Sequence, residues 1–279
     1  MRVNELFDFI QKRHDIYIMR EKGYLKPWTS DPILQQYRFC NVYRELDTQT
    51  IWFANNWRVP NAEDPDLWFA SLVFRFVNWS ETAAELGYPV PWDPQRFKAV
   101  LQGRKRRKLK VYSAAYMIST HGVKEEKSSY LANSLSKIWQ FKEQFRFEKN
   151  DTLSTMHRRL TGAFDVGSFL AGQVIADAKY AGDILKASDW WTFAASGPGS
   201  RRGLNRVCNA PINIPWKEDV WYDTLRTLKN RIDPMFKKAR MPQLHAQDLQ
   251  NCLCEFDKYE RVRLGEGRPK AKYNGVSYE

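Results

Sequence analysis

The sequence lacks the arrangements of cysteine and histidine that hold a structural metal ion. Its four cysteines, Cys40, Cys208, Cys252 and Cys254, form no C-x-x-C pair, and none has a histidine at ligand spacing. A structural zinc site is therefore not expected, and the sequence predicts no metal and no cofactor. With no signal peptide at its start, the chain and its free thiols fit a reducing cytoplasm.

Three further absences narrow the class of protein. No apolar run is long enough to cross a bilayer, so no membrane partner is expected. The pattern G-x-x-x-x-G-K-[ST] is absent, which excludes a triphosphate-binding P-loop. Strand-like alternation is nearly absent and nothing repeats internally, so we expect a mostly α-helical fold.

Positive charge and aromatic residues are what the chain has in abundance. Lysine and arginine number 44 against 32 acidic residues, a formal charge of +12. Such a surplus indicates a polyanionic partner. Most of the 11 Trp, 13 Tyr and 16 Phe should lie in the core, and a minority can stack on unpaired bases.

Apolar residues at helical spacing predict helices along most of the chain. The predicted helices cover residues 3–21, 32–57, 66–79, 93–102, 127–148, 153–162, 168–182, 219–232 and 244–265. The helix at 66–79 is apolar on nearly all sides, which predicts a central buried position. Residues 111–120 fit a helix or a strand. No shift in composition marks a boundary, so we expect one domain over residues 1–264 and a basic, partly flexible tail over 265–279.

Two of these helices are joined by a tight turn that can bind DNA. The turn reads D-V-G-S, and backbone N–H groups at Gly167 and Ser168 can approach a phosphate there. Asp165 stands where such hairpins usually have a first glycine. The arrangement resembles helix-hairpin-helix DNA glycosylases, whose catalytic aspartate follows the second helix at about the spacing of Asp189. Turns of this kind also join ordinary helices.

Two clusters of cations can hold phosphate groups. The run from Arg104 to Lys110 fits a phosphate-contacting strip, although such runs are also solvated loops or localisation signals. In the sequence from Pro198 to Arg206, glycines flank two arginines near a predicted helix start, which suits an oxyanion site. The alternative is a capped helix with exposed arginines.

Carboxylates and amides at helical spacing supply candidates for acid–base chemistry. Asp177 is either a buried carboxylate with a raised pKa or a surface residue. In the last helix, a polar stripe can bind an amine and take its proton, or can simply be a solvated face. The stripe consists of Asp248, Asn251, Glu255 and Lys258. On the predicted second helix, Arg38, Asn41, Arg44, Glu45 and Asp47 form either a salt-bridged face or one side of a cleft.

Four ordered motifs together resemble one family. They are RFCNVYRELD (38–47), AFDVGSFLAGQVIADAKY (163–180), DWWTFAASGPGSRRGLNR (189–206) and DLQNCLCEFDKYERVRLGEGRPKAKY (248–273). The family is the phage α-glutamyl/putrescinyl-thymine pyrophosphorylases, which are amino-acid or amine:DNA transferases and are similar to the helical domain of some 5-hydroxymethyluracil DNA kinases. No kinase module accompanies the motifs, so we expect no phosphorylation by this chain.

The resemblance implies a reaction on DNA and a set of partners. A separate 5-hydroxymethyluracil DNA kinase would first pyrophosphorylate the base in double-stranded phage DNA, in the host cytoplasm. This chain would then displace pyrophosphate with an amine from a free amino acid or polyamine, on a base flipped from the duplex. The implied fold is that of the helical glycosylases. The rival functions are a DNA glycosylase and a non-catalytic DNA-binding partner of the kinase.

The resemblance also assigns roles to residues. The general base is Asp189, with Asp177 and Glu255 as alternatives. The ligands of pyrophosphate or donor are Arg201, Arg202, Asn205, Arg206, Arg38, Asn41, Arg44 and Lys258. The DNA contacts are Gly167, Ser168, Arg104, Lys105, Arg106, Arg107, Arg261, Arg263 and Arg268.

Overall fold

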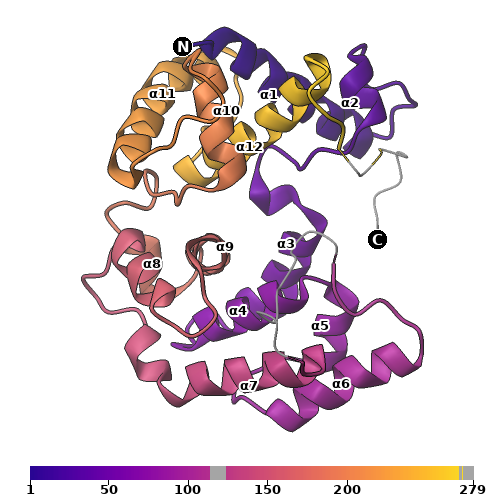
Figure 1. Ribbon diagram of the computed structural model, residues 1–279, viewed down its shortest axis with the longest axis vertical. Helices are drawn as coiled ribbons and strands as arrows, with labels where there is room; N and C mark the ends of the chain where they lie inside the picture. Colours follow the sequence, from indigo (N-terminus) through magenta and orange to yellow (C-terminus); the bar gives the residue numbers. More distant parts are fainter. Residues whose placement is uncertain (114–123, 270–271, 273–279) are drawn as a thin grey trace. The chain divides into compact units, whose positions relative to one another are not determined.

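A computed structural model describes residues 1–113, 124–269 and 272, and this part of the chain is helical, with one isolated bridge between Tyr37 and Lys272 (Figure 1). The predicted all-α class is confirmed. Most of the segment 111–120 and most of the tail 265–279 lie outside the described residues. The helices are α1 (Val3–Glu21), α2 (Pro32–Gln36), α3 (Thr48–Phe53), α4 (Leu67–Val77), α5 (Ser80–Leu86), α6 (Pro94–Arg106), α7 (Lys127–Gln140), α8 (Leu153–Thr161), α9 (Ser168–Ala178), α10 (Pro198–Val207), α11 (Glu218–Lys238) and α12 (Ala246–Arg263).

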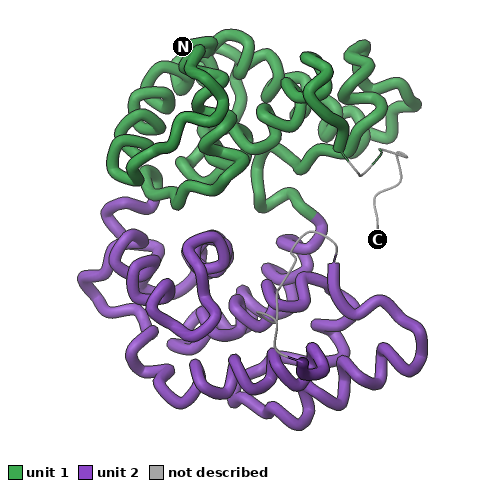
Figure 2. Tube along the Cα trace, viewed as in Figure 1, with its two compact units in different colours: residues 1–47, 191–279 green, residues 48–190 purple. Residues whose placement is uncertain are grey.

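Residue contacts divide the chain into two compact units (Figure 2). Unit 1 combines residues 1–47 with residues 191–279, and unit 2 comprises residues 48–190. The even composition of the chain gives no sign of this division. That residues 1–264 form one domain stays a prediction.

The core of unit 2 is built around α4. All eleven residues of this helix are buried, so the predicted central position is confirmed. Aromatic side chains surround it: the Phe74 ring stacks on Trp52 at 5.8 Å, and Phe69 contacts Trp139 at 4.8 Å between centroids. Helix α9 packs along α4. Because Asn78 takes a left-handed conformation (φ 44°), α4 ends there.

The hairpin of α8 and α9 begins and ends close to the predicted residues. Thr152 and Thr155 form a capping box that starts α8. The left-handed residue of the turn is Asp165 (φ 60°), whereas Gly167 is extended (φ −79°). The aspartate therefore takes the conformation that glycine usually supplies in such turns.

Unit 1 is a bundle in which α12 packs closely against α10 and also contacts α1 and α11. Helix α11 was predicted to stop at Pro234 but continues to Lys238. A proline inside a helix removes one backbone hydrogen bond. Packing compensates here, because Phe236 beyond it is 1% exposed and contacts the Phe7 ring at 5.3 Å.

Two of the predicted helices are shorter in the structure than the sequence indicated. Residues 32–57 do not form one helix: α2 ends at Gln36, and Tyr37 is extended (φ −113°, ψ 145°). Residues 38–43 follow without helical structure, and a short 3-10 turn covers Arg44–Leu46. Helix α7 likewise ends at Gln140 rather than at residue 148. In a helix, the backbone N–H and C=O groups of residues 38–44 would bond to one another. Here several of them bond instead to side chains from elsewhere in the chain.

Candidate functional site

Residues 38–47, which we name the 38–47 segment, lie against one side of α12. The Glu255 carboxylate accepts the N–H of Cys40 at 3.1 Å, and Asp248 accepts the N–H of Arg44 at 3.0 Å. The Lys258 ammonium donates to the carbonyl of Arg38 at 3.1 Å. The predicted residues Arg38, Asn41, Arg44, Glu255 and Lys258 therefore come together in unit 1, although the segment is not the helix that their spacing suggested.

Glu255 and Lys258 form the centre of this arrangement. Glu255 is 6% exposed, and its Oε2 lies 2.6 Å from the Lys258 ammonium. The negative charge of Glu255 is the main cause that raises the pKa of the Cys40 thiol to about 12. A shielded carboxylate of this kind can hold an ammonium group and accept its proton.

The same site extends from α12 to α10. Burial, followed by the charge of Glu255, raises the pKa of the Cys254 thiol to about 11, whereas Lys258 and Arg202 act to lower it. Asp257 also acts on this thiol. Charged side chains of both α10 and α12 thus act on the Cys254 thiol.

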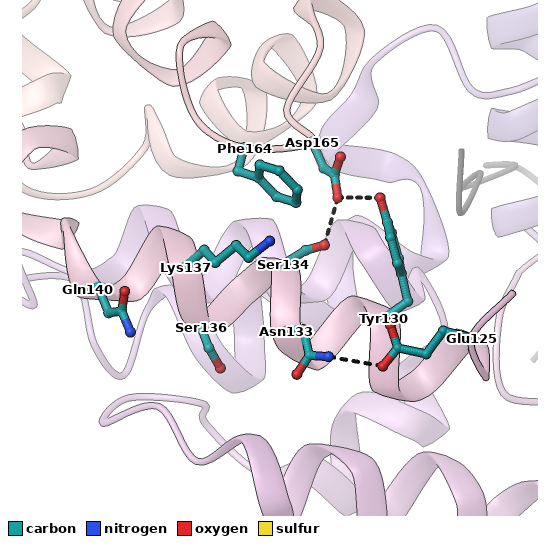
Figure 3. A pocket seen from close by; sticks show the side chains of 9 residues that line it. All are labelled: Glu125, Tyr130, Asn133, Ser134, Ser136, Lys137, Gln140, Phe164 and Asp165. Atoms are coloured by element: carbon teal, nitrogen blue, oxygen red, sulfur yellow. Dashed lines mark hydrogen bonds between the residues drawn. The ribbon is translucent and has the colours of Figure 1, made fainter. Parts of the chain in front are cut away.

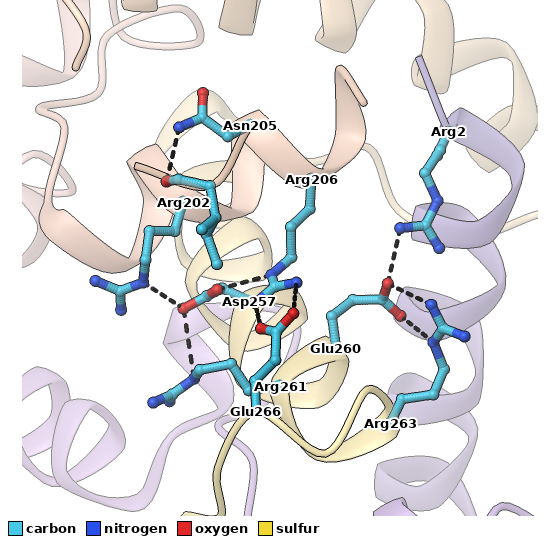
Figure 4. A network of polar contacts seen from close by, with 10 residues as sticks. Arg2, Arg202, Asn205, Arg206, Asp257, Glu260, Arg261, Arg263 and Glu266 are labelled. Atoms are coloured by element: carbon cyan, nitrogen blue, oxygen red, sulfur yellow. Dashed lines mark hydrogen bonds and ion pairs between the residues drawn. The ribbon is translucent and has the colours of Figure 1, made fainter. Parts of the chain in front are cut away.

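Arg202 belongs to a network around the buried Asp257 (Figure 4). Arg202 Nε donates to Asp257 at 2.8 Å and Arg206 Nε at 2.9 Å, and Arg206 also pairs with Glu266. Burial alone would lower the pKa of Arg206, but Glu266 and Asp257 raise it above its ordinary value. Arg206 is thus held within the protein, whereas 36% of the Arg202 side chain is exposed and can contact an anion.

The side chains of Arg201 and Asn205 point away from Asp257, the partner of Arg202. Neighbouring helix residues point about 100° apart, and Arg201 turns toward α11, where it pairs with Glu218 at 2.7 Å. The Asn205 amide is 1% exposed and donates to the carbonyls of Ile212 and Ile214, each at 3.0 Å. The side chains predicted to form one clamp, Arg201, Arg202 and Asn205, therefore contact different parts of unit 1 in this structure.

The glycines beside these arginines face α12 rather than a ligand. A Cβ on Gly203 would lie 2.0 Å from the carbonyl oxygen of Leu253, and one on Gly199 would lie 2.4 Å from the Cys254 sulfur. Gly199 and Gly203 are one helical turn apart, so they form a groove that accepts the α12 backbone. Their function is helix packing, which places Arg202 beside Asp257.

Asp189, the first candidate for general base, lies in unit 2 and caps α8. Its carboxylate accepts the N–H groups of Leu153 at 2.7 Å and Ser154 at 2.9 Å. Negative charge at a helix N-terminus also interacts favourably with the helix dipole. This geometry favours a structural role.

Replacing Asp189 by alanine tests that role. Because the substitution removes both acceptors from the first turn of α8, we expect unit 2 to lose about 1 kcal/mol of stability. Urea unfolding monitored by circular dichroism measures the loss, and Asp183→Ala, at an exposed aspartate of the same unit, is the control. An unchanged midpoint for Asp189→Ala would show that the cap contributes nothing.

Asp177, the second candidate, is fully buried in unit 2. Arg75 Nε and Nη2 donate to its two carboxylate oxygens, and Arg58 donates to its carbonyl at 3.1 Å. Of the two positions left open, the buried one is observed. With 0% of the residue exposed, the geometry favours a structural ion pair over contact with a substrate.

The predicted DNA contacts fall into exposed and internal residues. Arg104 is 2% exposed and is held by Glu81 and Glu85, which favours a structural role over the predicted phosphate contact. Lys105, Arg106 and Arg107 are exposed, although Arg107 pairs with Glu85 at 2.6 Å. In unit 1, the partly exposed Arg261 lies 3.7 Å from Asp257, Arg263 pairs with Glu260, and Arg268 is exposed.

At the hairpin turn, backbone donors remain accessible. Gly167 and Ser168 are exposed, and within the described residues no side chain caps the N-terminus of α9. Phe164 and Phe169, 46% and 48% exposed, stand on either side of these two residues in the sequence. Open N–H groups at a helix N-terminus suit a phosphate.

Arg13 is a residue that the sequence interpretation missed. It is 4% exposed in α1, and its guanidinium donates to the carbonyls of Cys40 and Asn41, the latter at 3.1 Å. Arg13 therefore supports the 38–47 segment from α1, by donating to carbonyl groups of its backbone. Arg13 lies on the same face of α1 as the buried Leu6 and Ile10. This helical spacing could have indicated from the sequence that Arg13 is buried.

No group of three or more His, Cys, Asp or Glu side chains among the described residues is arranged to hold a metal ion. None of their helices combines the length and apolarity needed to span a bilayer.

Comparison with known proteins adds a family. The family described as "5-hmdU DNA kinase, helical domain" matches residues 1–268. A 5-hmdU DNA kinase of Bacillus phage SP10 is 25% identical over 300 residues, which cover 94% of this chain and 47% of that protein. The chain thus spans about half the length of this curated relative, and no solved structure matches it. The expected similarity to the helical domain of these kinases is confirmed: the chain belongs to the family of the 5-hmdU DNA kinase helical domain.

Proposed function

We propose that this protein takes part in thymine hypermodification of phage DNA, by transferring an amine to the 5-methylene carbon of pyrophosphorylated 5-hydroxymethyluracil. The family match and the relative named as a 5-hmdU DNA kinase support the pathway. The more specific resemblance to the pyrophosphorylase family supports the amine transfer. A kinase of this type, acting separately, would supply the pyrophosphorylated base in the cytoplasm of the infected cell.

The reaction requires a base and an anion site close together. The amine nitrogen forms a bond to the methylene carbon while the carbon–oxygen bond to pyrophosphate breaks, and pyrophosphate leaves with the electron pair. The nitrogen then loses a proton to a carboxylate. Cations beside the leaving oxygen stabilise the charge that develops there.

The observation that carries the proposal is the buried carboxylate of Glu255 and its ion pair with Lys258. Its carboxylate lies 2.6 Å from the Lys258 ammonium, and Arg202 of α10 pairs with Asp257, two residues further along α12. We assign the proton transfer to Glu255 and the pyrophosphate contact to Lys258 and the exposed end of Arg202. Arg38, at the start of the 38–47 segment, is exposed and can extend the anion site.

DNA binding is assigned to unit 2 and to the basic surface. The α9 N-terminus at Gly167 and Ser168 provides backbone donors for a phosphate. The exposed cations Lys105 and Arg106 add sequence-independent attraction, in keeping with the formal charge of +12.

The direct test uses DNA carrying pyrophosphorylated 5-hydroxymethyluracil, incubated with the protein and a mixture of amino acids and polyamines. Mass spectrometry of the released nucleosides should detect a thymidine adduct and identify the donor. The Glu255→Gln variant keeps the shape and an acceptor oxygen but is a far weaker base, so we expect the transfer rate to fall about 100-fold or more.

The matched control is Glu63→Gln, which changes an exposed glutamate of unit 2 and should retain the full rate. Absence of an adduct with every donor would refute the amine transfer. Abasic sites in the treated DNA would instead identify a glycosylase. An undiminished rate in Glu255→Gln would reject Glu255 as the base.

A further inference from the structure

A cavity of about 580 Å³ lies in unit 2 between α7 and the hairpin turn (Figure 3). One face of α7 lines it with polar side chains three and four residues apart, and the turn contributes Phe164 and Asp165. The lining residues on α7 are Tyr130, Asn133, Ser134, Ser136, Lys137 and Gln140. Its volume falls within the range of sites that enclose a small organic ligand.

Asp165 attaches the turn to α7 and fixes the shape of the cavity. Its Oδ2 accepts the hydroxyl of Tyr130 at 2.7 Å and that of Ser134 at 2.6 Å. The left-handed backbone of Asp165 (φ 60°) directs the chain so that Phe164, next to it, also lines the cavity. Hydrogen bonds to α7 thus hold Asp165 in place, and the ring of the neighbouring Phe164 stays partly exposed.

Phe164 and Lys137 offer two complementary groups. The phenyl ring is 46% exposed, and the Lys137 ammonium lies 4.1 Å from its centroid. Because the Lys137 ammonium lies over one face of the ring, a nucleobase would stack on the opposite face, and the ammonium can contact the phosphate of the same nucleotide. Glu125 also lines the cavity and accepts one N–H of Asn133 at 2.9 Å. The carbonyl oxygen of Asn133 and the amide of Gln140 can contact the edge of a base.

We propose that this cavity binds one nucleotide, with its base stacked on Phe164 and its phosphate at Lys137. The nucleotide comes either from an unpaired position in a DNA strand or from free nucleotide. This inference rests on one part of the proposed function, the binding of DNA at the hairpin. It does not depend on the amine transfer. It assigns the cavity to binding, whereas Glu255 and Arg202 of unit 1 carry the proposed chemistry.

The test measures binding of unmodified duplexes that differ only in one unpaired 2-aminopurine nucleotide, without any amine donor. We expect the protein to bind the bulged duplex more tightly than the paired one and to quench 2-aminopurine fluorescence through stacking. Phe164→Ala should weaken binding of the bulged duplex about 10-fold and abolish the quenching. It should leave the paired duplex unaffected.

Phe141→Ala is the matched control, because this phenylalanine is 56% exposed and does not line the cavity. It should bind both duplexes as the unchanged protein does. Lys137→Gln should reduce the slope of log affinity against log salt by about 0.7, as expected for one lost phosphate contact. Competition by a free deoxynucleoside monophosphate that Phe164→Ala abolishes would support the free nucleotide as the source.

Equal binding of both duplexes, together with no effect of Phe164→Ala on duplex or monophosphate binding, would overturn the inference. Such a result would leave the proposed transfer intact, since the adduct assay reports that reaction independently. Conversely, loss of the adduct in the transfer assay would not change the outcome of these binding measurements.

Discussion

Replacing Gly203 by alanine is expected to destabilise unit 1 by about 3 kcal/mol or more. The added Cβ would lie 2.0 Å from the carbonyl oxygen of Leu253 and 2.6 Å from its carbonyl carbon. These are backbone atoms of α12, so no side chain can rotate away and the two helices must separate. The better helix propensity of alanine, about 1 kcal/mol, offsets only part of this cost.

Gly167→Ala provides the control for this substitution. Gly167 has φ −79°, and a Cβ there would meet nothing within 4 Å. Its effect should stay within about 0.5 kcal/mol. Urea unfolding and the labelling rate of Cys252, which is 0% exposed beside this helix contact, measure the two variants. Equal stability of both would show that α10 and α12 do not pack as described.

Part of the fold was accessible from sequence because its determinants are local. The hairpin follows from a capping threonine, two apolar stripes and a turn aspartate, all within residues 152–178. Helix α4 was recognisable because nearly every residue is apolar. In each case residues within one or two helical turns determine the structure, and the spacing of apolar residues in the sequence shows which of them share a face.

The 38–47 segment was misjudged for the opposite reason. Its residues have helical spacing, but their backbone groups bond to Glu255 and Asp248, more than two hundred positions away in the chain. No local pattern reports such partners. The same holds for Arg201 and Arg202, which look like a pair in the sequence but contact different helices.

The candidate site contains residues whose positions follow from local spacing and residues whose positions depend on distant partners. Glu255 and Lys258 were found because three-residue spacing on a real helix places them together. Arg104 and Asn205 were assigned to ligands because polar residues in loops and helix ends usually face solvent, yet both are buried with protein partners. Burial depends on the tertiary structure, which the residue type alone does not reveal.

Asp177→Ala is expected to destabilise unit 2 by about 3 to 5 kcal/mol. The change leaves the Arg75 guanidinium, 4% exposed as a side chain, without the carboxylate that neutralises it. Asn78 and Thr50 also accept hydrogen bonds from Arg75, but neither carries a charge. Urea unfolding of unit 2 monitored by circular dichroism measures the loss.

The double variant Arg75→Met/Asp177→Leu separates structure from chemistry. Because it removes both charges and keeps apolar volume, it should regain most of the stability lost in Asp177→Ala. If Asp177 serves only as the partner of Arg75, the double variant should also regain amine transfer in the adduct assay. Restored folding without restored transfer would instead show that the pair of Arg75 and Asp177 contributes to the reaction beyond its contribution to stability.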